Sequence, residues 1–228
     1  SLDTHQVRFL ARNNAESITL FVTFSPNRTS ATKLESAQAR EDVAAHWKRY
    51  WTEGGMIDFS GSTDPRAQEL ERRIVLSQYL MAVNAAGTFP PQEEGLFSNS
   101  WNGKFHLEMH LWHTAHFAVW GRTRLLERSM PWYFDHLEQA KARAKSQGVE
   151  GAWWPKMTGP DGNESPSTIN PFIMWQQPHP IYLSELIYRD RPTAETLERY
   201  RAIVFETAEL LASFVHFDEA TERYVLGP

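Results

Sequence analysis

The 228-residue sequence predicts a mainly α-helical protein in which helical hairpins form two layers behind a short N-terminal β-hairpin. From residue 31 onward, capped segments with apolar residues on one face follow one another along the chain. They alternate with two segments that are apolar on nearly every face. One-sided segments are typical of surface helices, and segments apolar all round are typical of helices buried among others. The expected order is surface helix, loop, buried helix, surface helix, loop, buried helix, surface helix.

Composition narrows the class of protein before any element is assigned. Apolar residues make up 41% of the chain and charged residues 22%, which indicates a soluble globular protein with a real core. The formal charge of −5 offers no basic surface for a phosphate backbone, so we expect no nucleic-acid partner. No apolar run approaches the roughly 20 residues that cross a bilayer, so we expect no membrane partner. The absence of cysteine excludes disulfides and leaves the compartment open.

The chain begins with two elements of different kinds. Residues 5–24, HQVRFLARNNAESITLFVTF, contain two β-prone runs around an Asn-Asn-Ala-Glu turn and predict a hairpin. An isolated hairpin is only marginally stable, so this one requires a partner sheet that the rest of the chain does not provide. Residues 31–55, ATKLESAQAREDVAAHWKRYWTEGG, predict an amphipathic helix that ends at Gly54.

Three more surface helices are bracketed by their end signals. Asp64 and Pro65 before an apolar pattern, with Gly87 after it, predict a helix over about 65–85. Residues 130–148, MPWYFDHLEQAKARAKSQG, predict a helix that ends at their last glycine. Thr193 caps the last helix, which we expect to end near Phe217. Its apolar positions share one face: Leu197, Tyr200, Val204, Ala208, Leu211 and Val215.

The two buried helices are expected over 104–120 and 180–188, and each follows a long loop. The loops are GTFPPQEEGLFSNSWNG (87–103) and a second over 148–180, which is too long and too aromatic for a simple connector. In a two-layered array, the loops that enter buried helices converge on one end, where helix N-termini also present unpaired N–H groups. The sequence therefore predicts that both loops line one shared pocket.

Histidines in the first buried helix raise the possibility of a metal site. His106, His110 and His113 lie on one helix face, a spacing that could place two of them on zinc. Glu108 lies about 200° around the helix from His106, so the general base of a zinc hydrolase would face away. We therefore expect no metal and no cofactor, with the histidines hydrogen-bonded inside the helical layer. A histidine-based metallohydrolase stays open as a third interpretation.

Glu108 is the most informative polar residue, because a carboxylate in an apolar helix must find hydrogen-bond donors or a ligand. Trp112 follows one turn later, and Trp101 comes just before the helix. A carboxylate beside an indole suits a sugar, whose hydroxyls donate while its C–H face stacks on the ring. The structural alternative is an ion pair between Glu108 and an arginine such as Arg122 or Arg72.

The second loop repeats this chemistry with indoles, a lysine and carboxylate and amide groups. Asp161 and Asn163 add further hydrogen-bonding groups to it. Two loops of matching composition at matching positions favour one oligosaccharide- or glycoside-binding wall over unrelated structural roles. The predicted substrate-binding residues are Trp101, Asn102, Glu108, Trp112, Trp153, Trp154, Lys156, Glu164, Gln176, Gln177 and His179.

Several motifs in this order resemble glycoside hydrolase family 65 and its (α/α)6-barrel relatives, which include disaccharide phosphorylases and inverting hydrolases. Trp47 and Trp51 match a Trp-x-x-x-Trp helix, and Phe105 to Met109 match a Phe-Trp-Asp-Thr-Glu motif, with Glu108 at the glutamate. A later Gly-x-x-Gly-Ala-x-x-Pro stretch is matched by Gly148, Gly151, Ala152 and Pro155. A Gly-x-Glu motif is matched by Gly162 and Glu164. The similarity covers residues 40–228. One departure is that His106-Leu107 replaces the family's Trp-Asp pair.

The resemblance implies an incomplete (α/α)6-type barrel over residues 29–228, behind a hairpin over 1–28 left from an N-terminal β-sandwich. In the family, the general-acid glutamate follows a Gly-Pro-Asp motif in the next loop, so we expect it beyond Pro228. An inverting hydrolase needs an acid and a base roughly 6.5–9.5 Å apart. We therefore expect an inactive fragment of a glycoside hydrolase acting on α-glycosidic bonds, its catalytic residues unknown. Its exposed apolar faces predict self-association or a partner in the remaining half of the barrel. A non-catalytic helical interaction module is the alternative.

Overall fold

The computed structural model describes residues 8–10, 15–20, 22, 35–96, 98 and 101–226. The chain divides into two compact units, residues 1–52 and 53–228. In the first unit, helix α1 (Ser36–Thr52) matches the helix expected there, and Tyr50 packs between Trp47 and Trp51 at ring distances of 5.3 and 4.9 Å. Residues 8–10, 15–20 and 22 form no strand, and the rest of the expected hairpin lies outside the described residues. A boundary at residue 28 therefore stays a prediction.

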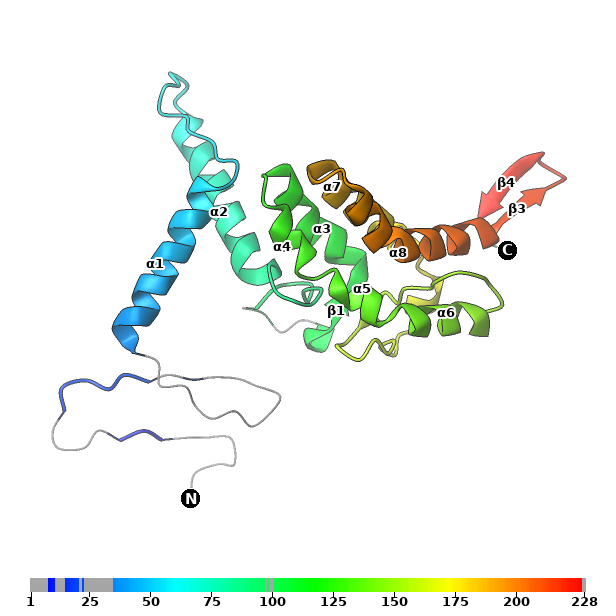
Figure 1. Ribbon diagram of the computed structural model, residues 1–228, viewed down its shortest axis with the longest axis horizontal. Coiled ribbons are helices and arrows are strands. Elements are labelled where there is room, and N and C mark those ends of the chain that lie inside the picture. Colours follow the sequence, from blue (N-terminus) through cyan, green and yellow to red (C-terminus); the bar gives the residue numbers. More distant parts are fainter. Residues whose placement is uncertain are drawn as a thin grey trace. The chain divides into compact units, whose positions relative to one another are not determined.

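The second unit is mainly helical, as the sequence predicts (Figure 1). Its described residues form α2 (Ala67–Ala85), α3 (Leu107–Val119), α4 (Thr123–Glu127), α5 (Pro131–Asp135), α6 (Leu137–Ser146), α7 (His179–Asp190) and α8 (Ala194–Ser213). Short 3-10 turns occupy Trp101–Gly103 and Asn170–Phe172. Among the described residues, no helix is long and apolar enough to span a membrane.

Helices α3 and α7 are the buried pair that the sequence predicts. Helix α3 buries Leu107, Glu108, His110, Thr114 and Phe117, and it packs against α2, α4 and α7. Helix α7 also packs against α8. The two helices therefore form the centre of this unit, and side chains at their N-termini can meet.

Helix α8 begins as expected but buries a different face. The Thr193 hydroxyl accepts a hydrogen bond from the Thr196 amide at 3.1 Å, which is the predicted N-cap. The buried side chains are Thr196, Tyr200, Ile203, Thr207 and Leu210. Of the predicted stripe only Tyr200 is among them, and Leu197 is 54% exposed. The predicted stripe was wrong because two threonines on the buried face make it look polar in sequence.

Two expected helices end differently in the structure. The segment 130–148 is split into α5 and α6 at His136, whose ring stacks on Trp132 at 4.5 Å and whose Nδ1 hydrogen-bonds the Trp132 carbonyl at 2.8 Å. Helix α8 ends at Ser213 instead of near Phe217, and the chain continues as an antiparallel hairpin, β3 (Val215–Asp218) and β4 (Arg223–Leu226). A packed Phe217–Tyr224 pair joins the two strands, with ring centroids 5.1 Å apart.

A second small sheet joins the two long loops at the start of α3. Strand β1 (Phe105–His106) pairs antiparallel with β2 (Met157–Thr158), placing His106 opposite Met157. Isolated bridges extend this contact on both sides, from Gln92 to Phe105 and from Thr158 to Glu164. Short strand pairing therefore fixes the two loops to each other.

Candidate functional site

The predicted meeting of the two loops at the entrance to α3 is present in the structure. The Leu107 amide donates to the Lys156 carbonyl at 2.8 Å, which ties the first turn of α3 to the second loop. His179, at the start of α7, hydrogen-bonds the Leu107 carbonyl through Nδ1 at 3.0 Å. Both buried helices and both loops thus contribute to one location.

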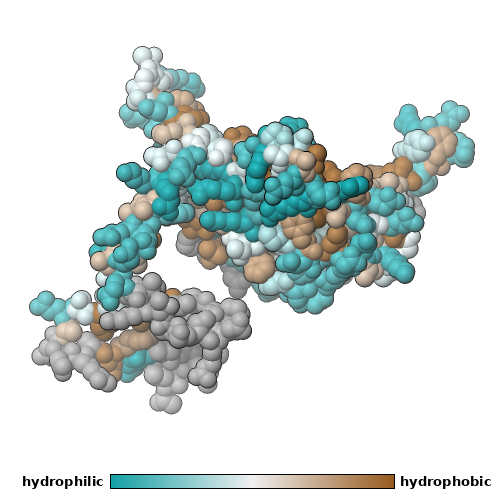
Figure 2. Space-filling view, viewed as in Figure 1, coloured by the Kyte–Doolittle hydropathy of each residue, from teal (hydrophilic) through white to brown (hydrophobic). Residues whose placement is uncertain are grey.

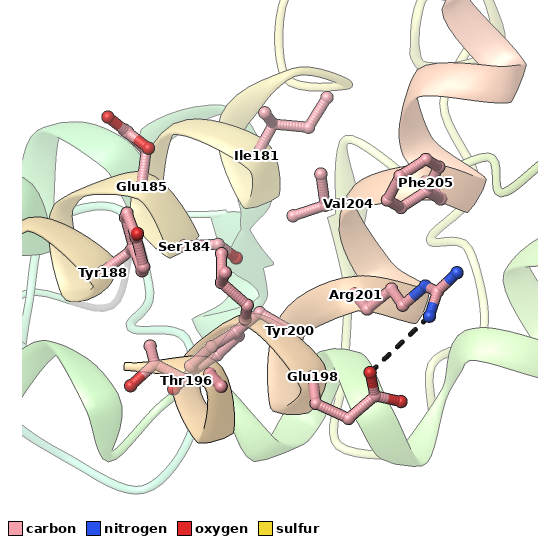
Figure 3. A pocket seen from close by; sticks show the side chains of 12 residues that line it. Ile181, Ser184, Glu185, Tyr188, Thr196, Glu198, Tyr200, Arg201, Val204 and Phe205 are labelled. Carbon is pink, nitrogen blue, oxygen red and sulfur yellow. Dashed lines mark ion pairs between the residues drawn. The ribbon is translucent and has the colours of Figure 1, made fainter. Parts of the chain in front are cut away.

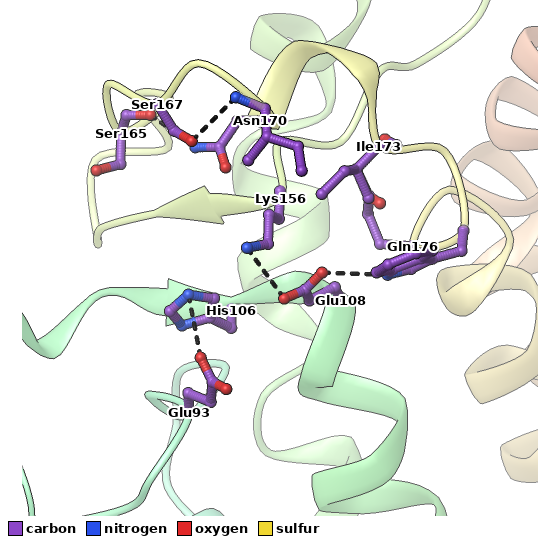
Figure 4. Close-up of polar contacts among 11 residues, drawn as sticks. Glu93, His106, Glu108, Lys156, Ser165, Ser167, Asn170, Ile173 and Gln176 are labelled. Carbon is purple, nitrogen blue, oxygen red and sulfur yellow. Dashed lines mark hydrogen bonds and ion pairs between the residues drawn. The ribbon is translucent and has the colours of Figure 1, made fainter. Parts of the chain in front are cut away.

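Glu108 lies at the centre of this location and is 9% exposed (Figure 4). Its Oε1 is 3.2 Å from the Lys156 ammonium, and its Oε2 accepts a hydrogen bond from the Trp175 indole N–H at 3.2 Å. The Lys156 side chain is only 10% exposed. A carboxylate with four acceptor positions is therefore held between two donors in a nearly buried setting.

His106 lies beside this pair and is fully buried. Among the described residues, neither ring nitrogen makes a hydrogen bond of good geometry; Nε2 is 3.5 Å from Oε2 of Glu93, and the Lys104 backbone also interacts with the ring (Figure 4). Burial lowers the pKa of His106, while the Glu93 charge opposes that shift and the Lys156 charge adds to it. The imidazole is therefore neutral near pH 7, and its contact with Glu93 is electrostatic without hydrogen-bond geometry.

Two partly exposed indoles border the polar cluster. Trp101 is 52% exposed; its ring lies 5.4 Å from the Lys156 ammonium and 5.8 Å from the His106 ring, edge-on. Trp175 is 65% exposed and donates to Glu108 as described. Trp101 and the following Asn102 both have positive φ, 50° and 58°, which non-glycine residues rarely adopt. This tight 3-10 turn sets Trp101 against the cluster.

Trp153 and Trp154 do not present their indoles to solvent as expected, because they are 2% and 1% exposed. Trp154 packs edge-on against Tyr133 at 4.9 Å, and its indole N–H donates to the Thr207 hydroxyl at 2.9 Å. Trp153 packs with Ala144 and Leu210 in a core cluster. A sugar has no access to either ring face here, so both tryptophans anchor the second loop to α6 and α8.

Gln176 and Gln177 are also structural in this geometry, since both are almost fully buried. The Gln177 side chain accepts from the Trp154 amide and donates to the Trp154 carbonyl, both at 2.8 Å. Gln176 donates to the Ile173 carbonyl at 2.7 Å. These amides close the second loop on itself, and they position Trp175 between them and the site.

Four predicted residues remain: His179, Glu164, Trp112 and Asn102. Burial lowers the pKa of His179, while the Glu108 charge opposes that shift. Glu164 bridges to Thr158 through its backbone, and its Oε1 is buried without a hydrogen bond. Trp112 is 68% exposed on α3, and Asn102 is an exposed turn residue. In the described part of the chain, no hydrogen bond or ion pair joins Trp112, Asn102 or Glu164 to Glu108 or Lys156.

The other histidines of α3 have structural partners. His110 is fully buried between the Tyr133 hydroxyl at 2.9 Å and the Ser129 hydroxyl at 2.8 Å. His113 contacts the Glu93 carbonyl through Nε2 at 2.9 Å, which fixes the first loop. Within the described ranges, no group of three histidine, aspartate or glutamate side chains is placed to hold a metal ion.

Arg122 does not pair with Glu108; it donates to the Gln78 side chain at 2.8 Å and to the Gly55 carbonyl at 3.0 Å. Arg72 pairs with Glu69 instead. The cation of the site is Lys156, and sequence reasoning missed the other two contributors, Glu93 and Trp175. Glutamates in the Gln-Glu-Glu stretch of the first loop were the available signal for Glu93. Comparison of the sequence with protein-family models and with curated proteins finds no match.

Proposed function

We propose that this chain is part of a carbohydrate-active enzyme that acts on α-glycosidic bonds, with Glu108 and its neighbours binding sugar hydroxyls. The proposal is carried by one observation: a nearly buried carboxylate is held between the Lys156 ammonium and the N–H of the exposed Trp175 indole, with the half-exposed Trp101 indole beside Lys156. The motif resemblance to family 65 glycoside hydrolases supports an (α/α)6-type helical domain, to which the observed helical pairs would contribute.

The chemistry of the cluster suits a polyhydroxylated ligand. Glu108 uses one acceptor position on each oxygen, so acceptor capacity remains for ligand hydroxyls. Lys156 has three N–H donors and one carboxylate partner, so donors remain as well. The Trp101 and Trp175 rings supply apolar faces on which sugar C–H groups can stack. Paired donors, acceptors and stacking faces are the usual composition of a small polar-ligand site.

Binding of α-linked disaccharides tests the proposal directly. Isothermal titration calorimetry with trehalose, maltose, kojibiose and nigerose should show that at least one binds and quenches tryptophan fluorescence. Glu108→Gln should weaken that binding by about tenfold or more, because hydrogen bonds to a charged acceptor contribute about 1.5–3 kcal/mol. Trp112→Phe, on the exposed side of the same helix, is the matched control and should leave binding unchanged. Absence of binding by all four sugars would remove the proposal.

A helical interaction module remains the second candidate, and one feature favours it. A groove of about 540 Å³ between α7 and α8 is lined by apolar side chains including Ile181, Leu197, Val204 and Phe205 (Figure 3). Apolar patches also interrupt the polar surface in Figure 2. Under this alternative, Phe205→Asp would abolish association measured by sedimentation, and sugars would leave tryptophan fluorescence unchanged.

A further inference from the structure

We propose that Glu93 gives the candidate site one uncompensated negative charge, so that it prefers neutral or aminated sugars to sugar acids. This inference rests on the proposed function for the identity of the ligand. The charge itself follows from the contacts around Glu93, His106, Lys156 and Glu108.

The charges of the cluster can be counted pair by pair. Glu108 and Lys156 are 3.2 Å apart with side chains 11% and 10% exposed, so their opposite charges cancel locally. Glu93 has no lysine or arginine nitrogen within 4.0 Å among the ion pairs of the described residues, and its only ion-pair neighbour there is His106. The Glu93 side chain is 27% exposed, so part of its field reaches the site opening.

His106 does not neutralise Glu93, because the imidazole is fully buried and its Nε2 lies 3.5 Å from Oε2 of Glu93, too far for a strong charge-assisted hydrogen bond. The charged and titratable groups around it are Glu93 from the first loop, Lys156 from the second, and Glu108 and His113 from α3. Burial dominates these influences and lowers the pKa of His106. A neutral imidazole thus occupies the position from which a cation would cancel Glu93.

The charge of Glu93 acts near the exposed indole of the site. His106, which Glu93 contacts at 3.5 Å, lies 5.8 Å from the Trp101 ring. The fully buried imidazole is not itself open to a ligand. A ligand carboxylate beside the Trp101 ring would meet the Glu93 charge. At about 6 Å and an effective dielectric constant near 40, the repulsion reduces affinity about tenfold.

Charged quenchers of Trp101 fluorescence test this charge without any sugar. The Trp101 component, taken as wild type minus Trp101→Phe, should be quenched more efficiently by Cs⁺ than by iodide, with acrylamide as the neutral reference. Glu93→Gln should lower the ratio of the Cs⁺ to the iodide quenching constant. Glu93→Asp, which keeps the charge, should leave this ratio close to wild type. Glu94→Gln changes an exposed neighbour by the same charge and should leave the ratio near wild type. A ratio unaffected by Glu93→Gln, or changed equally by Glu94→Gln, would overturn the inference.

A second titration compares D-glucosamine, D-glucose and D-glucuronate at pH 7.5. Glucuronate should bind about tenfold more weakly than glucose, and Glu93→Gln should close that gap by raising the affinity for glucuronate relative to glucose. Equal affinities of glucose and glucuronate in the wild type would refute the preference. If no sugar binds but the quencher ratio responds to Glu93→Gln, the proposed function fails while the uncompensated charge stands.

Discussion

Replacing Lys156 with methionine should destabilise the protein strongly, because Glu108 would lose the one cation that pairs with it among the described residues, in a nearly buried setting. Breaking a buried ion pair by removing one partner costs about 3–5 kcal/mol. Here both side chains are about a tenth exposed, and Glu108 keeps the Trp175 N–H at 3.2 Å. We therefore expect the lower end, about 3 kcal/mol of unfolding free energy.

A double-mutant cycle separates the ion pair from general packing. Lys156→Met with Glu108→Met replaces both charges by apolar groups of similar volume, and the double variant should unfold within about 1 kcal/mol of wild type. Urea denaturation followed by circular dichroism gives the midpoint of unfolding for each variant. The variants can be compared if the dependence of unfolding free energy on urea concentration is the same for all of them. Lys141→Met is the control, because Lys141 pairs with Glu206 at 2.8 Å but is 39% exposed, so loss of this pair should change stability much less. If Lys156→Met costs no more than this control, the pair does not hold the loops together.

Three further predictions concern the frame of the site. Gly151→Ala should lower the free energy of unfolding, measured by urea denaturation, by about 4 kcal/mol, because φ is +74° and the added methyl group would collide with the α8 backbone. Gly148→Ala is the control. Its φ is +77° but the space around it is open, so it should lower the unfolding free energy by about 1–2 kcal/mol. Burial lowers the pKa of His110 from 6.5 to about 3. The unfolded state therefore binds the proton more readily than the folded state does. The free energy of unfolding should fall as the pH drops below about 6.5, by up to about 1.4 kcal/mol per pH unit. His110→Gln should flatten that slope in denaturation midpoints measured between pH 7 and 5; an unchanged slope would contradict it. Thr193→Ala should lower stability by about 1 kcal/mol through loss of the α8 cap, and no change would show that the cap hydrogen bond is dispensable.

Helix positions were predictable where local signals agreed. Flanking glycines located the ends of α1 and α2, and the Thr193 cap located the start of α8. The predicted cap of α2 was wrong, because that helix begins after Arg66, two residues beyond Asp64. The all-round apolar pattern identified α3 and α7 as buried. The helix ends were missed where specific side-chain contacts accompany a change of backbone conformation. His136, at the break between α5 and α6, stacks on Trp132, and Phe217 and Tyr224 pair across the hairpin after Ser213.

Within the candidate site, the sequence identified Glu108 and Lys156 but not the roles of the neighbouring tryptophans. The cost of burying a carboxylate is intrinsic to Glu108, so its need for a partner follows from sequence alone. Whether an indole stacks on a ligand or fills the core depends on the surrounding packing, which the residue type does not reveal. Trp153 and Trp154 proved to be core, while Trp175 supplies the N–H beside Glu108.

The two indoles at either side of Lys156 in the site are held to different degrees: Trp154 is buried and fixed, and Trp101 is exposed. Trp154 is fixed by Gln177 through two backbone hydrogen bonds, so the second loop reaches Glu108 from a firm base. Lys156 follows Trp154 by two residues and therefore arrives at Glu108 with little freedom. The exposed Trp101, by contrast, lies in a turn with positive φ, where its carbonyl accepts from the Lys104 amide at 3.3 Å and its ring contacts Lys156 and His106. Under the proposed function, hydroxyl recognition by Glu108 and Lys156 would be geometrically strict, and stacking on Trp101 would tolerate different sugars.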